Sequence, residues 1–183
     1  MRRAIAFFVL VPLLVTGCGD RSLILTVDVL SFLDPADVSS DYGPIPGGIP
    51  STTVDLATQE ANLLPGIQDA TEISSATLQI GASFDNQTGT ANAHFLVYVT
   101  PGDSADVFSA PPIADIPVSV TPGTLTNVST EVTSTALAEA LVHEKAKIGV
   151  RATFDTTPSG ATPVQGTETI TLLRATVITK KKL

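Results

Sequence analysis

The chain has 183 residues, with 10 basic and 18 acidic side chains and a net charge of −8 at pH 7. This length suits one domain with a sizeable hydrophobic core. Two of the basic residues, Arg2 and Arg3, stand at the start of an apolar segment, so residues 19–183 carry 8 basic and 18 acidic side chains. An acidic surface of this kind repels phosphate, which excludes DNA and RNA as partners.

The first 17 residues have the pattern of an export signal. Two arginines follow Met1, and an almost purely apolar run extends from Ala4 to Val15. This run is shorter than the roughly 20 apolar residues that span a bilayer. We therefore expect residues 1–17 to be a signal peptide that is removed on export and takes no part in the fold.

The signal ends in Val15-Thr16-Gly17-Cys18, an apolar residue followed by two small residues and a cysteine. This sequence resembles the lipobox of bacterial lipoproteins, and the resemblance covers only the leader. It implies cleavage between Gly17 and Cys18 and a diacylglyceryl thioether on Cys18, with acyl chains of the palmitate type. Two acyl chains are enough for stable anchoring in a lipid membrane. Cys18 is the only cysteine, so an exported chain has no internal disulfide to form.

The alternative interpretation of the leader is an ordinary signal peptide with a cysteine near its cleavage site. If Cys18 is lipidated, residues 18–21 form a tether that reaches roughly 10–15 Å. The protein would then lie close to a membrane of the cell envelope. In the best-known sorting rule of Gram-negative lipoproteins, Asp directly after the cysteine retains the protein at the inner membrane. Gly19 stands there instead, so the resemblance favours the outer membrane.

The remaining sequence has the composition of short strands joined by turns. Thr and Val are abundant, and Pro and Gly interrupt the chain often. A branched Cβ suits the pleated surface of a sheet, and regular turn residues suit an all-β fold. We therefore expect residues 22–183 to form one antiparallel β-sandwich or jelly roll of about eight strands with one short helix.

Alternation of apolar residues predicts where the strands lie. They are expected at 22–33, 52–57, 71–85, 92–100, 116–120, 125–132, 147–155 and 167–179. Residues 34–51 hold four prolines and three glycines and are expected to form a loop. Turn residues from Asp85 to Gly89 predict that the strands on either side form a hairpin. Few apolar residues in 125–132 place that strand at a sheet edge.

Three further features concern the second half of the chain. The apolar phase shifts between Leu172 and Leu173, which predicts a β-bulge or a stretch buried on both faces. An apolar stripe predicts the single helix over residues 134–145. If the first and last strands pair antiparallel, Lys180, Lys181 and Lys182 return to the lipid side, where they could contact anionic headgroups. The alternative is a solvated tail.

The sequence contains no recognised catalytic motif, and we expect no enzyme. It lacks a Gly-x-Ser-x-Gly elbow and a Ser-x-x-Lys motif. His94 is expected on the polar face of a strand. His143 stands four residues after Glu139, a spacing that suits a surface ion pair on a helix. An enzyme would need a pocket that gathers several acids, or His94 beside an acid.

Calcium is the metal ion for which the sequence offers the best candidate ligands. Asp34, Asp37 and Asp41 lie within eight residues of the predicted loop, and calcium binds six to eight oxygen ligands. The spacing is not that of an EF-hand, and aspartates in loops commonly form turns instead. Asp103 and Asp106 form a second, sparser cluster.

Two hypotheses of function follow for the part after Cys18, which is not assigned to a family. The first is a non-catalytic envelope lipoprotein that serves as a structural or protein-interaction module. The alternative is a module that binds an extracellular glycan or another polymer, with calcium assistance. Exposed rings of Tyr42 or Tyr98 beside a groove would favour the glycan, whereas a buried Tyr98 together with a featureless surface would favour the interaction module.

Overall fold

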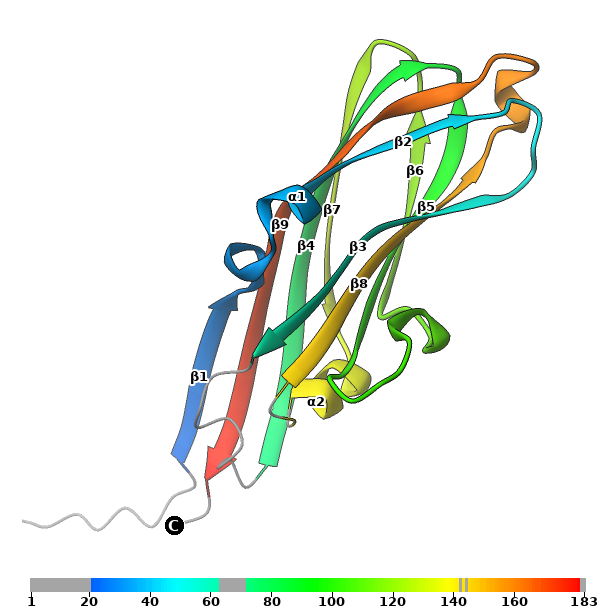
Figure 1. The fold of residues 1–183 in the computed structure, drawn as a ribbon. Helices are drawn as coiled ribbons and strands as arrows, with labels where there is room; N and C mark the ends of the chain where they lie inside the picture. Colours follow the sequence, from blue (N-terminus) through cyan, green and yellow to red (C-terminus); the bar gives the residue numbers. More distant parts are fainter. Residues whose placement is uncertain (1–20, 63–71, 142, 144, 182–183) are drawn as a thin grey trace, which may run out of the picture.

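The computed structural model describes residues 21–181 apart from 63–71, 142 and 144. Two antiparallel sheets pack face to face and form an elongated sandwich (Figure 1). In this part of the chain, no helix is both long enough and apolar enough to cross a membrane.

The first sheet has the strand order β1-β9-β4-β7, and β2 also pairs with β9. Its strands are β1 (Arg21–Asp28), β2 (Ser39–Ile45), β4 (Glu72–Thr88), β7 (Thr124–Thr133) and β9 (Val164–Lys181). The second sheet has the order β3-β8-β5-β6. Its strands are β3 (Thr52–Asn62), β5 (Ala91–Pro101), β6 (Ala114–Val120) and β8 (Lys145–Asp155). With β1 and β2 taken as one interrupted strand, this is the strand order of a jelly roll. The predicted fold class is confirmed.

Five short helices complete the described elements. The α-helices are α1 (Pro35–Val38) and α2 (Thr135–Leu141), and the 3₁₀ helices are η1 (Val29–Phe32), η2 (Val107–Ser109) and η3 (Thr157–Ser159). Helix α2 is the predicted helix, although it ends at Leu141 and not at Lys145. It buries Leu137, Ala140 and Leu141 against the first and second sheets near one end of the sandwich.

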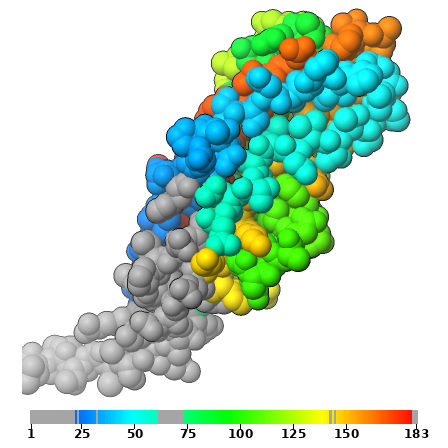
Figure 2. Space-filling model, viewed as in Figure 1, coloured from blue at the N-terminus to red at the C-terminus, as the bar shows by residue number. Residues whose placement is uncertain are grey.

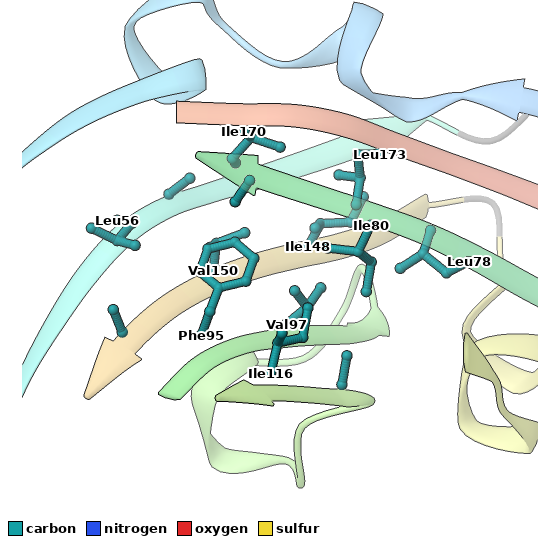
Figure 3. Packing of buried hydrophobic residues seen from close by; sticks show 14 of the residues in the cluster. Leu56, Leu78, Ile80, Phe95, Val97, Ile116, Ile148, Val150, Ile170 and Leu173 are labelled. Carbon is teal, nitrogen blue, oxygen red and sulfur yellow. The ribbon is translucent and has the colours of Figure 1, made fainter. Parts of the chain in front are cut away.

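The core lies between the two sheets, where alternate side chains of each strand point inward (Figure 3). Ile80 and Leu173 come from the first sheet, and Phe95 and Val150 come from the second. Aromatic rings fill one half of the core: Tyr42 stacks on Phe154 with 4.9 Å between the ring centroids. Burial of this apolar surface is the main favourable contribution to the stability of such a sandwich.

The hairpin predicted between residues 71–85 and 92–100, which correspond to β4 and β5, is wrong. Strand β4 pairs with β7 and β9 in the first sheet, whereas β5 pairs with β6 and β8 in the second. The turn after Asn86 therefore carries the chain from one sheet to the other. Both strands keep their apolar faces toward the core, which is why the sequence pattern alone did not distinguish the two arrangements.

The predicted loop over residues 34–51 is also wrong in part. Asp34 caps α1 by accepting a hydrogen bond of 3.0 Å from the amide of Ala36, and Pro35 begins the helix. Strand β2 then buries Tyr42 and Ile45. Its Pro44 is tolerated because β2 is an edge strand, where a missing amide donor leaves no unmade pair.

One condition set by the sequence analysis is met, and two predictions about strand arrangement are confirmed. Strands β1 and β9 pair antiparallel, with Ser22 opposite Lys180. Strand β7 lies at an edge of the first sheet and has no buried residue. The register between β4 and β9 shifts where Gly81 opposes Leu172 and Ala82 opposes Ile170. This β-bulge lies beside the predicted step in β9.

Candidate functional site

The two ends of the described chain lie together at one end of the sandwich, which we call the terminal pole (Figure 1). Strand β1 begins there at Arg21 and β9 ends there at Lys181, and these residues are register partners. Only Gly19 and Asp20 separate Cys18 from Arg21 in the sequence. Cys18 itself lies outside the described residues, as do residues 1–17 of the predicted signal. In the sequence, Cys18 is therefore followed almost at once by β1 of the first sheet.

The terminal pole carries an exposed apolar side chain next to a basic one. Ile24 is 65% exposed although it is a large hydrophobic residue. Its register partner is Ile178, and Lys180 follows two residues later on the same strand. Lys180 is exposed, whereas Lys182 and the side chain of Lys181 lie outside the described part of the structure. A surface that is apolar and basic suits contact with anionic headgroups.

Four connecting segments form the opposite end of the sandwich, which we call the distal cap (Figures 1 and 2). The segments are residues 46–51, 87–90, 121–123 and 156–163. Among their residues none is charged, although the protein as a whole is acidic. Sequence analysis missed the distal cap. Each of the four segments is visibly uncharged in the sequence, but the sequence does not show that they lie together at one pole.

Hydrogen bonds hold the distal cap in a defined shape. The buried hydroxyl of Thr156 donates to the carbonyl of Pro46 at 2.8 Å and accepts from the amide of Ile49 at 2.9 Å. Ser159 accepts from the amide of Thr90 at 3.1 Å. These bonds join three of the four segments. The cap is therefore a preorganised, uncharged surface, and preorganisation lowers the entropic cost of binding.

The three aspartates predicted as calcium ligands have different surroundings. Asp34 caps α1, and Asp41 accepts a hydrogen bond of 2.8 Å from the hydroxyl of Thr167. Asp37 lies in the first turn of α1. No group of three or more His, Cys, Asp or Glu side chains within the described residues is arranged to hold a metal ion. The second cluster is also divided, because Asp106 caps η2 while Asp103 lines a pocket.

The two histidines lie in separate places. Nδ1 of His94 is 2.7 Å from Oδ1 of Asp115 on the open face of the second sheet, where both side chains are more than half exposed. The structure thus places His94 beside an acid, but on a solvated surface. Exposed pairs of this kind contribute little energy.

His143 lines a pocket of about 320 Å³ together with Glu60, Asp103 and Lys145. The ammonium group of Lys145 lies 2.6 Å from the Glu60 carboxylate. Its hydrogen bond lowers the pKa of Glu60. This carboxylate therefore stays ionised and engaged, which makes it a poor general acid at neutral pH.

Neither tyrosine offers an exposed ring. Tyr42 is completely buried in the core, and Tyr98 is 5% exposed. Tyr98 lies beneath the connection between β5 and β6, where Phe108 meets its ring edge to face at 5.2 Å. Neither tyrosine therefore supplies the exposed ring beside a groove that would have favoured a glycan-binding module.

Arg151 fixes the β5–β6 connection to the outer face of the second sheet. Its guanidinium lies 4.0 Å from the centre of the Phe108 ring and its Nε donates to Asp55. The hydrogen bond to Asp55 raises the pKa of Arg151. Close packing adds to this contact, since a Cβ on Gly149 would lie 2.6 Å from Cγ1 of Val107. These contacts of Arg151, Phe108 and Asp55 have a structural role, because they hold the β5–β6 connection against the sheet. Sequence analysis did not identify them.

Glu168 is the one fully buried acid among the described residues. Neither carboxylate oxygen has a hydrogen-bond partner there, and burial raises the pKa of Glu168 to about 8. Burial also raises the pKa of Tyr42, as do the charges of Asp85 and Glu168. Glu168 stands between inward-facing Gly166 and Ile170 in the pattern of β9. The sequence did contain a signal for this buried acid: Glu168 occupies a position of the strand where the alternation places inward-facing residues.

No family model matches the sequence, and a comparison with curated proteins gives no match. Among solved structures, the chain is similar to a chain in the structure of infectious bursal disease virus Gx strain. The two are 14% identical over 97% of this chain, with a TM-score of 0.42. The VP2 subviral particle of that virus gives 13% identity over 97% and a TM-score of 0.42. The chain spans 41% and 37% of the length of these viral chains.

TmCBM61, solved in complex with β-1,4-galactotriose, is a further match with 13% identity, 88% coverage of both chains and a TM-score of 0.30.

Proposed function

We propose that this protein is a lipoprotein of the bacterial cell envelope, anchored by a lipid on Cys18, whose β-sandwich is a non-catalytic structural or protein-interaction module. The observation that carries the proposal is the position of the terminal pole. The strand that follows Cys18 begins there, and the uncharged distal cap lies at the opposite end of the sandwich. A lipid at Cys18 would therefore direct the cap away from the membrane.

The surface of the terminal pole supports the same orientation. Exposed Ile24 and Lys180 would face the lipid, and each basic residue near an anionic surface contributes about 1 kcal/mol. Gly19 after the cysteine favours the outer membrane in a Gram-negative host. The interaction partner would be another envelope protein that contacts the distal cap.

The anchor is tested by the mass of the N-terminal peptide of protein taken from membranes of a native-like host. A diacylated or triacylated Cys18 is expected in the wild-type chain. The Cys18→Ala variant should lack it and leave the membrane fraction. An unmodified N-terminus, or a wild-type chain that is freely released, would contradict the proposal and make the protein a secreted β-sandwich.

The role of the cap is tested by placing a photo-crosslinking residue at Pro122, in the cap, or at Ser119, on the side of the sandwich. A discrete adduct formed from position 122 and not from position 119 is the expected result. Equal crosslinking at both positions would show that the cap is not a preferred contact surface.

A further inference from the structure

Strand β7 is an unprotected sheet edge. Within the described part of the chain it pairs with β4 and with no other strand. Its ten residues match β4 in one uninterrupted register from Thr124 to Thr133. An edge of this kind presents a row of unpaired backbone amide and carbonyl groups, which is a ready template for another strand.

The other sheet edges carry features that discourage pairing. Strand β6 contains Pro117 and Asp115, and β3 contains Asp55, Glu60 and a register shift. The edge formed by β1 and β2 is interrupted by two helices. Proline, charge, bulges and interruptions are the usual means by which proteins protect an edge.

Strand β7 has none of these features apart from a single charge. It has no proline and no register shift, and its only charged residue is Glu131. Leu125 on this strand is 62% exposed, one of two large hydrophobic residues so exposed among the described residues. In a protein with 18 acidic and 10 basic residues, a ten-residue strand with a single charge lets two copies approach with little repulsion.

We propose that the free edge of β7 pairs antiparallel with β7 of a second copy, about a two-fold axis at Ser129. The two first sheets would then form one continuous sheet. A two-fold interface requires a self-complementary surface, and this register provides one over residues 125–133. The pairs are Leu125 with Thr133, Thr126 with Val132, Asn127 with Glu131, and Val128 with Thr130.

The register is chosen by the charge on Glu131. About Ser129, each Glu131 faces the amide of Asn127 from the other copy, and its carboxylate already accepts a hydrogen bond of 2.9 Å from Gln79. About Val128, each Glu131 would face exposed Leu125 instead. About Glu131 itself, two like charges would face each other, which is destabilising.

The antiparallel arrangement also determines how two copies are oriented. Strand β7 runs from the β6–β7 turn in the distal cap toward α2 (Figure 1). Antiparallel pairing therefore directs the two terminal poles in opposite directions. This consequence rests on the proposed lipid anchor: paired copies would join two facing membranes, whereas neighbours standing upright on one membrane could not pair in this way.

Analytical ultracentrifugation of the full processed chain, in mild detergent if it is lipidated, tests the pairing. The wild type should form a dimer. Ser129→Lys should weaken the dimer at least tenfold, because two lysines would face each other at the axis. Thr58→Lys is the matched control, because Thr58 is an exposed residue of β3, an edge strand of the second sheet. This variant should leave the dimer intact. Circular dichroism verifies that each variant is folded.

Mixing two variants tests the axis itself. Ser129→Lys and Ser129→Glu should each be monomeric, and an equal mixture should form a heterodimer because opposite charges then meet. A monomeric wild type, or a Ser129→Lys variant that dimerises as the wild type does, would overturn the proposal. These outcomes do not depend on whether Cys18 carries a lipid.

Vesicles coated with the lipidated chain test the orientation separately by light scattering. Wild-type protein should cluster the vesicles, and Ser129→Lys should not. Dimers that fail to cluster vesicles would overturn the facing arrangement.

Discussion

The hydroxyl of Tyr42 donates a hydrogen bond of 3.1 Å to Oδ1 of Asn86, and both residues are completely buried. The amide of the Asn86 side chain donates in turn to the carbonyl of Gly89 at 2.7 Å. Edge strand β2 is thereby joined to β4 and to one segment of the distal cap. Gly166 permits this contact, because a Cβ there would lie 2.4 Å from the Tyr42 hydroxyl.

Removing the Tyr42 hydroxyl should destabilise the protein. Tyr42→Phe leaves a buried carbonyl oxygen of Asn86 without its donor, which costs about 1–3 kcal/mol. Urea unfolding followed by circular dichroism measures the change in the free energy of unfolding. Tyr98→Phe is the matched control, since the Tyr98 hydroxyl has no hydrogen-bond partner among the described residues. Equal losses in the two variants would refute the role of the Asn86 bond.

Glu168 should make the stability of the protein depend on pH. Burial raises its pKa from 4.5 to about 8, so between these values the folded chain binds a proton that the unfolded chain lacks. The free energy of unfolding should therefore fall as pH rises through this window, by about 1.4 kcal/mol per pH unit at most. Below pH 4.5 both states are protonated and the effect is absent.

Glu168→Gln removes this titration, because an amide does not ionise. Relative to the wild type, the variant should gain on the order of 2–4 kcal/mol in unfolding free energy between pH 5 and pH 8. Urea unfolding at both pH values gives the difference. Glu139→Gln, at an exposed position of α2, is the matched control because it makes the same substitution outside the core and outside β7. Parallel profiles for the wild type and Glu168→Gln would show that the buried acid does not titrate in this range.

Replacing Arg151 with lysine should loosen the connection between β5 and β6. Lysine keeps the charge but loses the planar stacking on Phe108 and the Nε hydrogen bond to Asp55. We expect a loss of about 1 kcal/mol and faster hydrogen exchange over residues 102–113. Arg174→Lys, at an exposed position of β9, is the control. Unchanged exchange in Arg151→Lys would mean that packing around Gly149 suffices.

The lysines at the end of the chain should bind anionic membranes. In a non-lipidated chain that begins at Gly19, changing Lys180, Lys181 and Lys182 to glutamine should weaken binding to anionic vesicles. A contribution of about 1 kcal/mol for each lysine corresponds to roughly fivefold for each. Vesicles of neutral lipid provide the control and should show no difference. The same affinity for both chains on anionic vesicles would mean that these lysines form a solvated tail.

Local patterns in the sequence predicted much of this protein. The proposed export leader and lipid site at Cys18 rest on consecutive residues and remain predictions. The strand positions follow from alternation, which is a property of the pleat itself. The edge position of β7 and the bulge in β9 were also predicted, because both depend on the distribution of apolar residues along a single strand.

Only the tertiary structure decided which strands pair and what the core encloses. Turn residues between Asp85 and Gly89 suit a hairpin and a crossing between sheets equally well, since the partner of each strand depends on residues far away in the sequence. Strand β2 escaped prediction because Pro44 is acceptable only at an edge. The uncharged cap is assembled from four separate turns, so it exists only once long-range pairing brings them to one pole.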